Sequence, residues 1–332
     1  MRRTAPAPGI REIVLTARET HLADRIVRRL VPEYRGTDET GLPAPLTKLA
    51  GQRGVLPARL LGALAGVRAR LGPAVTVVRR PRPDEDVGPT PSHWRLRGYA
   101  DTAAHDLWLA LVSLQVGDPV CWQTLQEGRL FNDVLPIKGQ EYAQTGHSSV
   151  DVLDFHVEDA FDDDRCDVLA LLCLRNPDAT ATTVATADAL RLDAADRELL
   201  RRPCFAILPD PEHLRPSRSA AAPAAMWRPV LFGDSPPYLR VDPAYTTTAP
   251  GDDASARAFS RLCHRLQQAL VRVRLRPGDL MLIDNYRAVH GRDPFAPRYD
   301  GTDRWLRKLT LTFDLARSSA RRRAGSRALP LT

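Results

Sequence analysis

Short runs with the spacing of β-strands dominate the chain from Val120 onward, and they constrain the fold more than any other feature. Some runs are continuously apolar, as a strand buried on both faces would be, and others alternate, as a half-buried strand would. Apolar residues at helical spacing appear in the first part of the chain and in two later segments. The predicted strands are 121–128, 130–137, 168–174, 280–283 and 305–315, and the predicted helices are 16–30, 56–71, 102–114, 187–202 and 257–273. This pattern predicts a mainly β fold with flanking helices.

The length and composition are those of one globular domain over residues 1–332. Of the 332 residues, 43% are hydrophobic and 26% charged, which allows a sizeable core. We expect a mostly helical part over 1–118, a β core over 119–316 and a solvated basic tail over 317–332. Residues 208–228 are rich in Pro, Ala and Ser without periodicity, so we predict a lid inserted into the core there.

Charge and cysteine content exclude several classes of partner and site. The net charge of +7 accompanies only 6% aromatic residues and no basic-aromatic motif, so no nucleic-acid partner is expected. The five cysteines show no CxxC spacing, which argues against a disulfide framework and against a structural zinc site. No stretch approaches the roughly 18 apolar residues of a membrane span, and no apolar leader is apparent. We therefore predict a cytoplasmic protein without a membrane partner.

Two histidines and one glutamate are predicted to meet at one point. Residues 151–161 alternate like a strand, and residues two apart on a strand share a face, so His156 and Glu158 converge. Residues 278–292 have the pattern of a turn, an apolar strand and then His290 in a glycine-flanked loop. Two histidines and a carboxylate form the facial triad of non-haem Fe(II) oxygenases, which leaves coordination positions open. We predict that His156, Glu158 and His290 bind Fe(II).

An arginine in the last strand supports this interpretation. Arg304 lies fourteen residues after His290 and opens the strand that follows it. A 2-oxoglutarate cosubstrate needs a cation for its far carboxylate, and the planar fork of arginine binds a carboxylate with two hydrogen bonds. The sequence therefore predicts that Arg304 binds 2-oxoglutarate.

Several long motifs resemble one known family. They are VGPTPSHW (87–94), LQEGRLFNDVLPIKG (125–139), FHVEDAFDDDRCDVLALLCLRNPDATATTVA (155–185), VLFGDSPPYLRVD (230–242) and GDLMLIDNYRAVHGRDPFAPRYDGTDRWL (278–306). With them the chain resembles the clavaminate synthase-like Fe(II)/2-oxoglutarate oxygenases, in particular the branch that hydroxylates C3 of free amino acids such as arginine and asparagine.

This resemblance implies a double-stranded β-helix (jelly-roll) core with flanking helices. It implies Fe(II), 2-oxoglutarate and O₂ as the reactants at the metal, and no catalytic side chain beyond the metal ligands. The implied activity is hydroxylation of an unactivated C–H bond, at C3 of a small-molecule amino acid with a basic or related side chain. Such activity belongs to specialised metabolism, including antibiotic biosynthesis, and a homodimer is a further expectation.

The resemblance also implies contacts to the backbone groups of the substrate and to the cosubstrate. Gln126 matches the position whose amide or acid holds the substrate's α-ammonium group better than its neighbour Glu127 does. Ser148, in the polar loop 140–149, matches a small residue that touches the substrate. A threonine of the segment 179–185 would contact 2-oxoglutarate, and the register leaves Thr182 and Thr183 equally eligible.

Two departures from the family pattern leave the identity of the substrate open. Asp242 falls where arginine-hydroxylating relatives hold the guanidinium group, but their second acid, two residues on, is Ala244 here. Lys308 stands where relatives usually place an arginine that faces the carboxylates of substrate and cosubstrate. Lysine keeps the charge and loses the fork, so the substrate contact at this position differs.

Other interpretations stay open at this point. A zinc hydrolase could use the same three ligands with a bound water, although it would not need Arg304. A jelly-roll protein that only binds its ligand is a second alternative, and within the oxygenases a carrier-bound substrate, desaturation or cyclisation are others. Of the nearby polar residues, we expect His147 to face solvent and the acidic run 162–164 to be a solvated loop rather than a calcium site.

Overall fold

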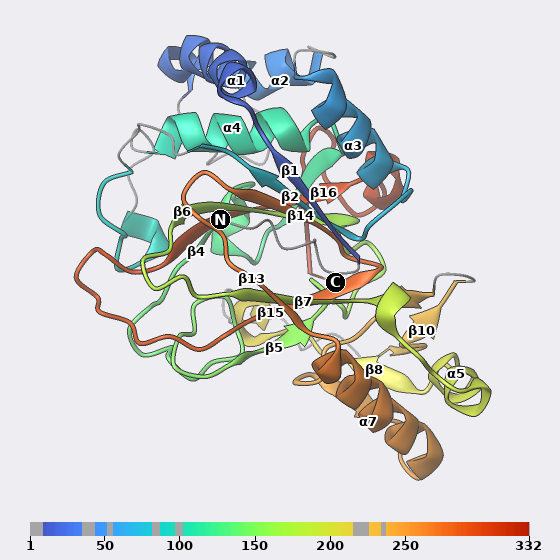
Figure 1. Ribbon diagram of the computed structural model, residues 1–332. Helices are drawn as coiled ribbons and strands as arrows, with labels where there is room; N and C mark the ends of the chain where they lie inside the picture. The colour runs from blue at the N-terminus through green and yellow to red at the C-terminus, as the bar shows by residue number, and fades with distance from the viewer. Residues whose placement is uncertain are drawn as a thin grey trace.

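The computed structural model describes residues 9–34, 44–51, 56–81, 87–96, 102–214, 226–233 and 237–331. Within them two β-sheets face each other, and helices cover the outer face of the larger sheet (Figure 1). The eight-stranded sheet has the order β1 (Ile10–Val14), β2 (Val75–Arg79), β14 (Leu280–Asp284), β6 (Val168–Arg175), β16 (Trp305–Thr312), β3 (Asp118–Trp122) and β17 (Ala328–Leu329), with β4 (Asn132–Val134) also paired to β16. The four-stranded sheet has the order β13 (Val271–Val273), β7 (Thr182–Thr186), β15 (Ala288–Arg292) and β5 (Leu153–His156). The prediction of a mainly β jelly-roll core with flanking helices is confirmed.

Strand β6 shows why the middle of the larger sheet is continuously apolar. Successive side chains of a strand point to opposite faces, and both faces of this sheet are covered. Val168, Ala170 and Leu172 pack into the core under the helices. Leu169 and Leu171 pack into the core between the two sheets. The run VLALLCL therefore has no position that a polar side chain could occupy without being buried.

The helices form from amphipathic segments, and most lie over the outer face of the larger sheet. Helix α1 (Ala17–Leu30) begins with a capping box, in which the Thr16 hydroxyl accepts from the Glu19 amide and the Glu19 carboxylate accepts from the Thr16 amide. Helix α4 (Ala103–Ser113) is almost wholly buried between the sheet and the other helices. The remaining helices are α2 (Ala44–Gly51), α3 (Ala58–Arg68), α5 (Ala194–Leu200), α6 (Pro211–Leu214) and α7 (Asp253–Gln268). Two small sheets, β12 (Thr246–Thr248) with β8 (Phe205–Ile207) and β9 (Trp227–Arg228), and β10 (Leu231–Phe232) with β11 (Tyr238–Leu239), lie with α5 and α7 at one end.

Some predicted boundaries are wrong, each for a local reason. The predicted strand 121–128 ends at Trp122, because Gln126, Glu127 and Gly128 adopt positive φ angles in a 3₁₀ turn. The predicted helix 257–273 ends at Gln268, and its last three residues form β13 because Val271 and Val273 pair with β7 instead.

The predicted solvated tail is also wrong. Residues 328–329 form β17, a parallel edge strand beside β3. Arg321 forms ion pairs with Asp162 at 2.7 Å and with Asp164 at 3.0 Å. The acidic loop is therefore not simply solvated, since its neighbour Asp163 binds Arg240 at 2.6 Å as well. These basic and acidic segments were predicted separately as solvated, whereas they neutralise each other.

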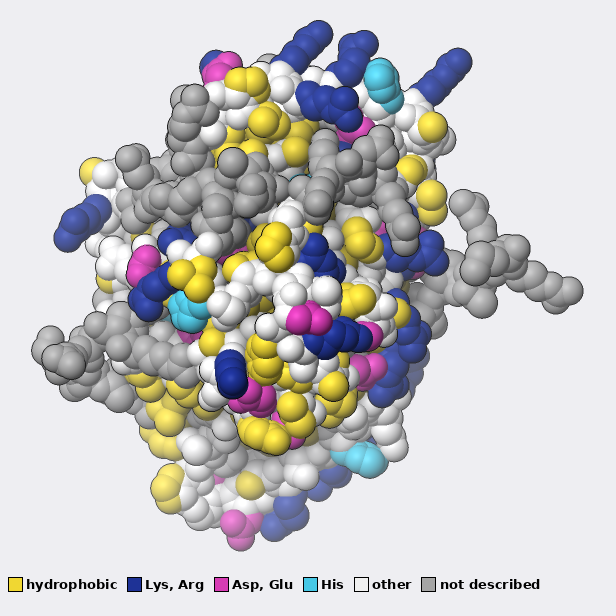
Figure 2. Space-filling model, turned by 90° about the vertical axis from the view of Figure 1, so that its left-hand side faces the viewer, with side chains coloured by type: hydrophobic (Ala, Val, Ile, Leu, Met, Phe, Trp, Pro, Cys, Tyr) yellow, Lys and Arg dark blue, Asp and Glu magenta, His cyan; other side chains and the backbone are white. Residues whose placement is uncertain are grey.

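The remaining charge is spread over the surface. On the face shown in Figure 2, Lys and Arg side chains lie among Asp and Glu side chains, and several basic side chains project at the top, where α1 lies. Those of α1 that are exposed are Arg18, Arg25, Arg28 and Arg29. Among the described residues, no helix has both the length and the apolar character needed to span a membrane. The predicted lid 208–228 is described only at its two ends, and its residues 215–225 lie outside the described residues.

Candidate metal centre and cavity

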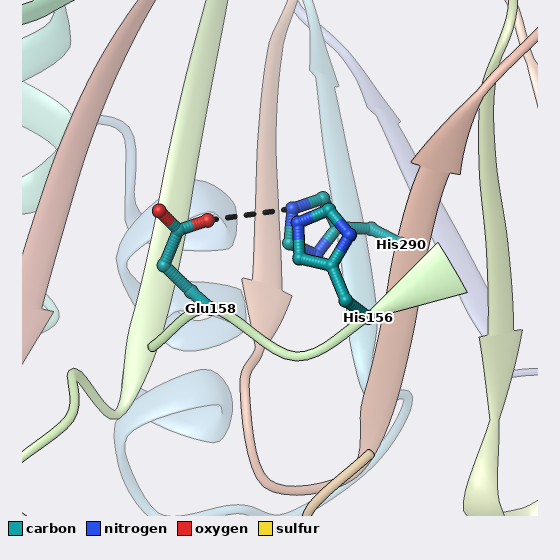
Figure 3. A group of neighbouring side chains, drawn as sticks. All are labelled: His156, Glu158 and His290. Carbon is teal, nitrogen blue, oxygen red and sulfur yellow. Dashed lines mark ion pairs between the residues drawn. The ribbon is translucent and has the colours of Figure 1, made fainter. Parts of the chain in front are cut away.

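Strands β5 and β15 bring the two predicted histidines together. His156 and His290 are direct partners in the antiparallel pairing of these strands, and their ring centroids lie 4.4 Å apart. Glu158 follows the end of β5, and its Oε2 lies 3.5 Å from Nε2 of His290 (Figure 3). One possible ligand atom from each of the three residues lies within 4.8 Å of the others, and in the part of the chain that the structure describes this is the one such group of three or more.

Hydrogen bonds orient two of these three residues. Nδ1 of His156 lies 2.8 Å from the carbonyl oxygen of Asp154, an arrangement in which Nδ1 carries the hydrogen and Nε2 is free to bind a metal. The backbone at Glu158 is clamped by Asn285, whose Oδ1 accepts from the Glu158 amide at 2.7 Å. Nδ2 of Asn285 donates to the Glu158 carbonyl at 2.9 Å. Sequence reasoning missed Asn285, although a buried polar residue that ends an apolar strand was a visible signal.

A glycine between His290 and Arg292 lets the strands approach. A Cβ atom on Gly291 would lie 2.5 Å from the Leu153 carbonyl oxygen and 3.0 Å from the Thr183 hydroxyl, so no larger residue fits unless strands β5 and β15 separate. Arg292 is buried, and its guanidinium donates to the carbonyl oxygens of Ser149 at 2.8 Å and Asp151 at 3.0 Å. Arg292 thereby fixes the loop at the rim of the site to β15, a role that sequence reasoning also missed.

The local electrostatics favour the metal-binding forms of the ligands. Burial alone would raise the pKa of Glu158, but the charge of Lys308 and the hydrogen bond from His290 outweigh it and hold the pKa well below its usual value. Burial, together with the neighbouring His156, lowers the pKa of His290 to about 4. At neutral pH the carboxylate is therefore ionised and the His290 imidazole neutral, and these are the forms that coordinate metals.

Arg304 is a buried cation that faces the same cavity. Its Nη2 donates to the Thr182 hydroxyl at 3.2 Å, and its Nε is buried without a hydrogen-bond partner among the described residues. Burial lowers the pKa of Arg304 to about 10, so the group keeps its charge at neutral pH. No ion pair to Arg304 occurs in the described part of the chain, and a buried guanidinium without an anion is a place where an anion can bind. Thr182 lines this cavity, whereas Thr183 does not.

The cavity, of about 970 Å³ including the part open to solvent, runs between the two sheets and has the side chains of His156, Glu158 and His290 in its wall. One region of the wall is apolar and contains Leu169, Leu171 and Leu306 beside Arg304. Another is acidic and contains Asp210, Glu212 and Asp242. The cavity wall thus carries a buried cation, Arg304, and a group of three acids in addition to the candidate metal centre's residues.

Of the residues predicted to bind substrate, Gln126 lines the cavity and Ser148 does not. The Gln126 amide is held by Asp133, donating to its carbonyl at 2.8 Å and accepting from its amide at 2.9 Å. Glu127 points away from the cavity and forms an ion pair with Arg95 at 2.7 Å. The Ser148 hydroxyl donates to the Thr145 carbonyl at 2.9 Å and accepts from Arg292 at 2.9 Å, so its direct contact with substrate is not supported by its position.

Asp242 and Lys308 both line the cavity. Burial, with a contribution from the nearby Asp210, raises the pKa of Asp242 to about 6, although the neighbouring His156 opposes the shift. Ala244 lies beside it, and its backbone amide donates to Asp242 Oδ1 at 3.2 Å. Nζ of Lys308 lies 2.5 Å from Glu158 Oε1, so this ammonium group contacts the predicted metal ligand itself.

His147 does not face solvent as predicted. It is 2% exposed, its Nδ1 lies 3.0 Å from the Leu135 carbonyl oxygen, and its Nε2 lies 3.6 Å from Glu212. The polar loop folds over the cavity instead of away from it, which buries the ring and makes it part of the cavity wall. His147 therefore supports the wall that carries Glu212.

Comparisons with known proteins agree with this geometry. The family model of the taurine catabolism dioxygenases (TauD, TfdA family) matches residues 115–310. The chain is 36% identical over 328 residues to enduracididine beta-hydroxylase of Streptomyces hygroscopicus, covering 92% of this chain and 94% of that protein. It is 35% identical over 335 residues to L-ornithine/L-arginine 3-hydroxylase of Catenulispora acidiphila, covering 94% of this chain and 97% of that protein.

A solved structure is similar over nearly the whole chain. The non-heme iron oxygenase OrfP in complex with Fe, succinate and (3S)-hydroxy-L-Arg superposes with a TM-score of 0.88 at 34% identity, covering 96% of this chain and 99% of that one. The same oxygenase in complex with Fe and alpha-ketoglutaric acid has a TM-score of 0.86 at 36% identity, with the same coverage.

Proposed function

The chain belongs to the taurine catabolism dioxygenase (TauD, TfdA) family, and on that premise we propose that it hydroxylates C3 of a free amino acid with a basic side chain, using Fe(II), 2-oxoglutarate and O₂. The observation that carries the proposal is a cavity that contains His156, Glu158 and His290 together with the buried Arg304, which has no ion-pair partner among the described residues. A zinc hydrolase would use the first three residues and would have no use for a buried cation beside them.

The three ligand residues suit Fe(II). They offer two imidazole nitrogens and one ionised carboxylate close to a single point. This is the donor set of the two-histidine, one-carboxylate facial site. The Nδ1 contact of His156 with the Asp154 carbonyl directs Nε2 of that ring towards the shared point. Bound iron, with 2-oxoglutarate and O₂, supplies the oxidative decarboxylation of the cosubstrate to succinate and CO₂ and the transfer of one oxygen atom into a C–H bond. The chain's own residues bind and orient the two organic molecules and exclude water.

Arg304 and Thr182 would hold the far carboxylate of 2-oxoglutarate. The Arg304 guanidinium is buried, keeps its charge and has no carboxylate partner in the described ranges of the chain, and the Thr182 hydroxyl lies 3.2 Å from its Nη2. A carboxylate placed between them would accept from both groups. Because Thr183 does not line the cavity, we assign the cosubstrate contact to Thr182.

The acidic wall supports a substrate with a cationic side chain. Asp210, Glu212 and Asp242 line the cavity near one another and are only partly exposed, and three carboxylates so close together repel one another unless a cation joins them. The enduracididine and ornithine/arginine hydroxylases that resemble the chain are named for amino acids of this kind. We assign the side chain of the substrate to this wall.

The backbone groups of the amino acid would lie near Gln126 and Lys308. The Gln126 amide is fixed by Asp133 and retains one lone pair on its oxygen that can accept from an α-ammonium group. Lys308 can meet the α-carboxylate while it contacts Glu158. We assign Ser148 to the support of the rim through Arg292 rather than to substrate contact.

An anaerobic titration separates the proposal from its rivals. Adding Fe(II) and then 2-oxoglutarate should produce a visible charge-transfer band, which should be lost in His156→Ala and kept in His264→Ala, an exposed histidine of α7. Zinc binding without any effect of 2-oxoglutarate would instead favour the hydrolase.

A screen of the proteinogenic amino acids, with arginine and lysine first, and of the non-proteinogenic ornithine then tests the substrate. Succinate release together with a product heavier by one oxygen atom is the expected result. A product lighter by two hydrogen atoms would indicate desaturation or cyclisation, and no turnover of any free amino acid would favour a carrier-bound substrate. A cytoplasmic location and a homodimer stay predictions.

A further inference from the structure

Helix α6 buries one side chain in a segment that is otherwise partly exposed. The His213 side chain is fully enclosed, whereas Pro211 and Leu214 are exposed. A helix of four residues is too short to be stable by its own hydrogen bonds. The contacts of His213 must therefore determine where this turn lies.

His213 is held on both ring nitrogens and along its edges. Its Nδ1 lies 2.8 Å from the hydroxyl oxygen of Thr124, and its Nε2 lies 3.1 Å from Oδ1 of Asp159. The ring packs edge-on against Trp122 and Phe161, with centroid distances of 5.3 and 4.9 Å. We call this environment, formed by Thr124, Asp159, Trp122 and Phe161, the His213 socket. Within it both ring nitrogens have a hydrogen-bond partner.

The His213 socket adjoins a predicted metal ligand, because its member Asp159 is the residue next to Glu158. Asp159 directly follows Glu158 in the chain and has a φ of +53°, a left-handed conformation that a residue other than glycine adopts at a cost in free energy. Its second oxygen accepts a hydrogen bond from Trp122 Nε1 at 2.8 Å. The Asp159 carboxylate is thus bound on both oxygens, and these bonds favour the unusual backbone that turns the chain after Glu158.

The turn at α6 that contains His213 carries two of the three acids that form the acidic region of the cavity wall. Asp210 Oδ1 accepts from the backbone amides of Glu212 at 2.7 Å and His213 at 3.3 Å. Asp210 and Glu212 both line the cavity. Since the backbone of this turn is fixed at His213, the position of both carboxylates depends on the histidine.

We propose that His213 is a positioning residue that fastens the acidic turn 210–212 over the cavity by bonding to Asp159, next to Glu158. The inference rests on the proposed function for its kinetic consequence, and on geometry alone for its structural one. When the turn is fastened, the acids meet the substrate's cation and water is excluded from the cavity. When it is released, the substrate binds weakly, and O₂ oxidises 2-oxoglutarate to succinate and CO₂ without hydroxylation, the second oxygen atom being reduced to water by a two-electron reductant in the assay such as ascorbate.

The first test is kinetic. His213→Leu introduces an apolar side chain of moderate size and removes both hydrogen bonds, and Thr124→Val removes one bond with little change in shape. His264→Leu, at an exposed position of α7, is the matched control. We expect His213→Leu to raise KM for the amino acid by about tenfold or more, as loss of a charge-assisted contact would, while kcat falls less and KM for 2-oxoglutarate stays unchanged. Succinate should exceed hydroxylated product in this variant and equal it in the wild type and in His264→Leu.

The second test needs no substrate. Amide hydrogen exchange of residues 208–214, followed by mass spectrometry, should be faster in His213→Leu and, to a smaller degree, in Thr124→Val. His213→Gln, whose amide can reach towards Asp159, should recover part of the protection. This measurement decides the structural claim even if no amino acid proves to be a substrate, which would overturn the proposed function separately.

Unchanged exchange in residues 208–214 of both variants overturns the proposal. Tight coupling of succinate to product in His213→Leu, with KM as in the wild type, overturns it as well. If His213→Leu fails to fold, the comparison of Thr124→Val and His213→Gln with the wild type decides in the same way.

Discussion

Nζ of Lys308 lies 2.5 Å from Oε1 of Glu158, while Oε2 of the same carboxylate lies 3.5 Å from Nε2 of His290. Oε1 of Glu158 therefore contacts the Lys308 ammonium group, and Oε2 faces the other residues of the candidate metal centre. A carboxylate held in this way presents a single oxygen to a metal, which leaves more positions for the organic acid and O₂. Lys308 is a partner of the ligand as well as a candidate contact for the substrate.

Replacing Lys308 by methionine should make metal binding more sensitive to acid. Without the ammonium group, burial would raise the pKa of Glu158, and protons would compete with the metal at higher pH. We expect the affinity for Fe(II) or Mn(II) near pH 6 to fall by about 10- to 100-fold, the usual effect of losing a partner of a metal ligand. Anaerobic titrations between pH 5 and pH 8 measure this, with the exposed Lys138→Met as control. Parallel pH profiles for Lys308→Met and the wild type would contradict the role assigned to Lys308.

Removing the guanidinium of Arg304 should weaken the binding of 2-oxoglutarate without affecting the binding of the metal. Two charge-assisted hydrogen bonds at about 1.5 kcal/mol or more each correspond to a loss of about a hundredfold in affinity for Arg304→Met. Arg304→Lys keeps the charge and loses the fork, so its loss should be smaller. The visible band of the anaerobic Fe(II) complex reports the Kd of 2-oxoglutarate directly. The control is Arg298→Lys, because Arg298 is exposed and forms an ion pair with Asp178. This variant should leave the Kd of 2-oxoglutarate unchanged.

Gly291→Ala should damage the site through the backbone. The new methyl group would lie 2.5 Å from the Leu153 carbonyl oxygen, which cannot move without separating the strands that carry His156 and His290. We expect a loss of about 1–3 kcal/mol in the free energy of unfolding, as for overpacked cores, and loss of the visible band. Gly62→Ala in α3 is a matched control, because nothing lies within 4 Å of its new methyl group. That variant should gain about 0.5–1 kcal/mol, and equal effects of the two substitutions would refute the argument.

The contacts of His213 should weaken as the pH rises. Burial lowers the pKa of His213 and the charge of Lys308 lowers it further, but the hydrogen bond to Asp159 and the charges of Asp159 and Asp210 outweigh both and raise the pKa above 6.5. A histidine whose pKa is raised on folding contributes stability that is complete below its unfolded pKa and is lost as the pH rises through the folded value. Amide exchange of residues 208–214, corrected for the intrinsic effect of pH, should therefore increase between pH 6 and pH 9. The same increase in His213→Leu would show that another group is responsible.

The fold and the candidate metal centre could be predicted because they depend on local patterns. The period-two alternation of residues 151–161 predicted that His156 and Glu158 lie together, which the structure confirms, although the strand is shorter than predicted and ends at His156. The continuous apolar run 168–174 indicated a strand covered on both faces. The jelly-roll topology and the approach of His290 came from the resemblance of long motifs, since spacing along the chain does not say which strands pair. The structure pairs His290 directly with His156.

Contacts between distant segments are what the sequence did not indicate. His147 was predicted to face solvent, and it is buried because its loop folds over the cavity. Asp162 and Arg321 each look like solvated charges alone, although they are 2.7 Å apart. The 3₁₀ turn Gln126–Gly128 requires positive φ angles at Gln126 and Glu127 as well as at its glycine, and hydrogen bonds between Gln126 and Asp133 stabilise it. Each of these features depends on a partner that periodicity cannot identify.

Asp242 should bind the positive charge of the substrate's side chain. The second acid that relatives have at the position of Ala244 should be restorable by substitution. Asp242→Asn keeps the shape and removes the charge, so we expect KM for a basic amino acid to rise by about tenfold or more, the value of one charge-assisted hydrogen bond, and KM for a neutral amino acid of equal length to change little. Ala244 also lines the cavity, and its backbone amide donates to Asp242 Oδ1 at 3.2 Å, so Ala244→Asp would place a second carboxylate beside the first. That variant should lower KM for arginine relative to the neutral analogue, whereas Ala244→Asn, which is equal in size and uncharged, should not. Competition assays with arginine and its neutral analogue measure the ratio, and an unchanged preference in both Asp242→Asn and Ala244→Asp would mean that the substrate's cation binds elsewhere.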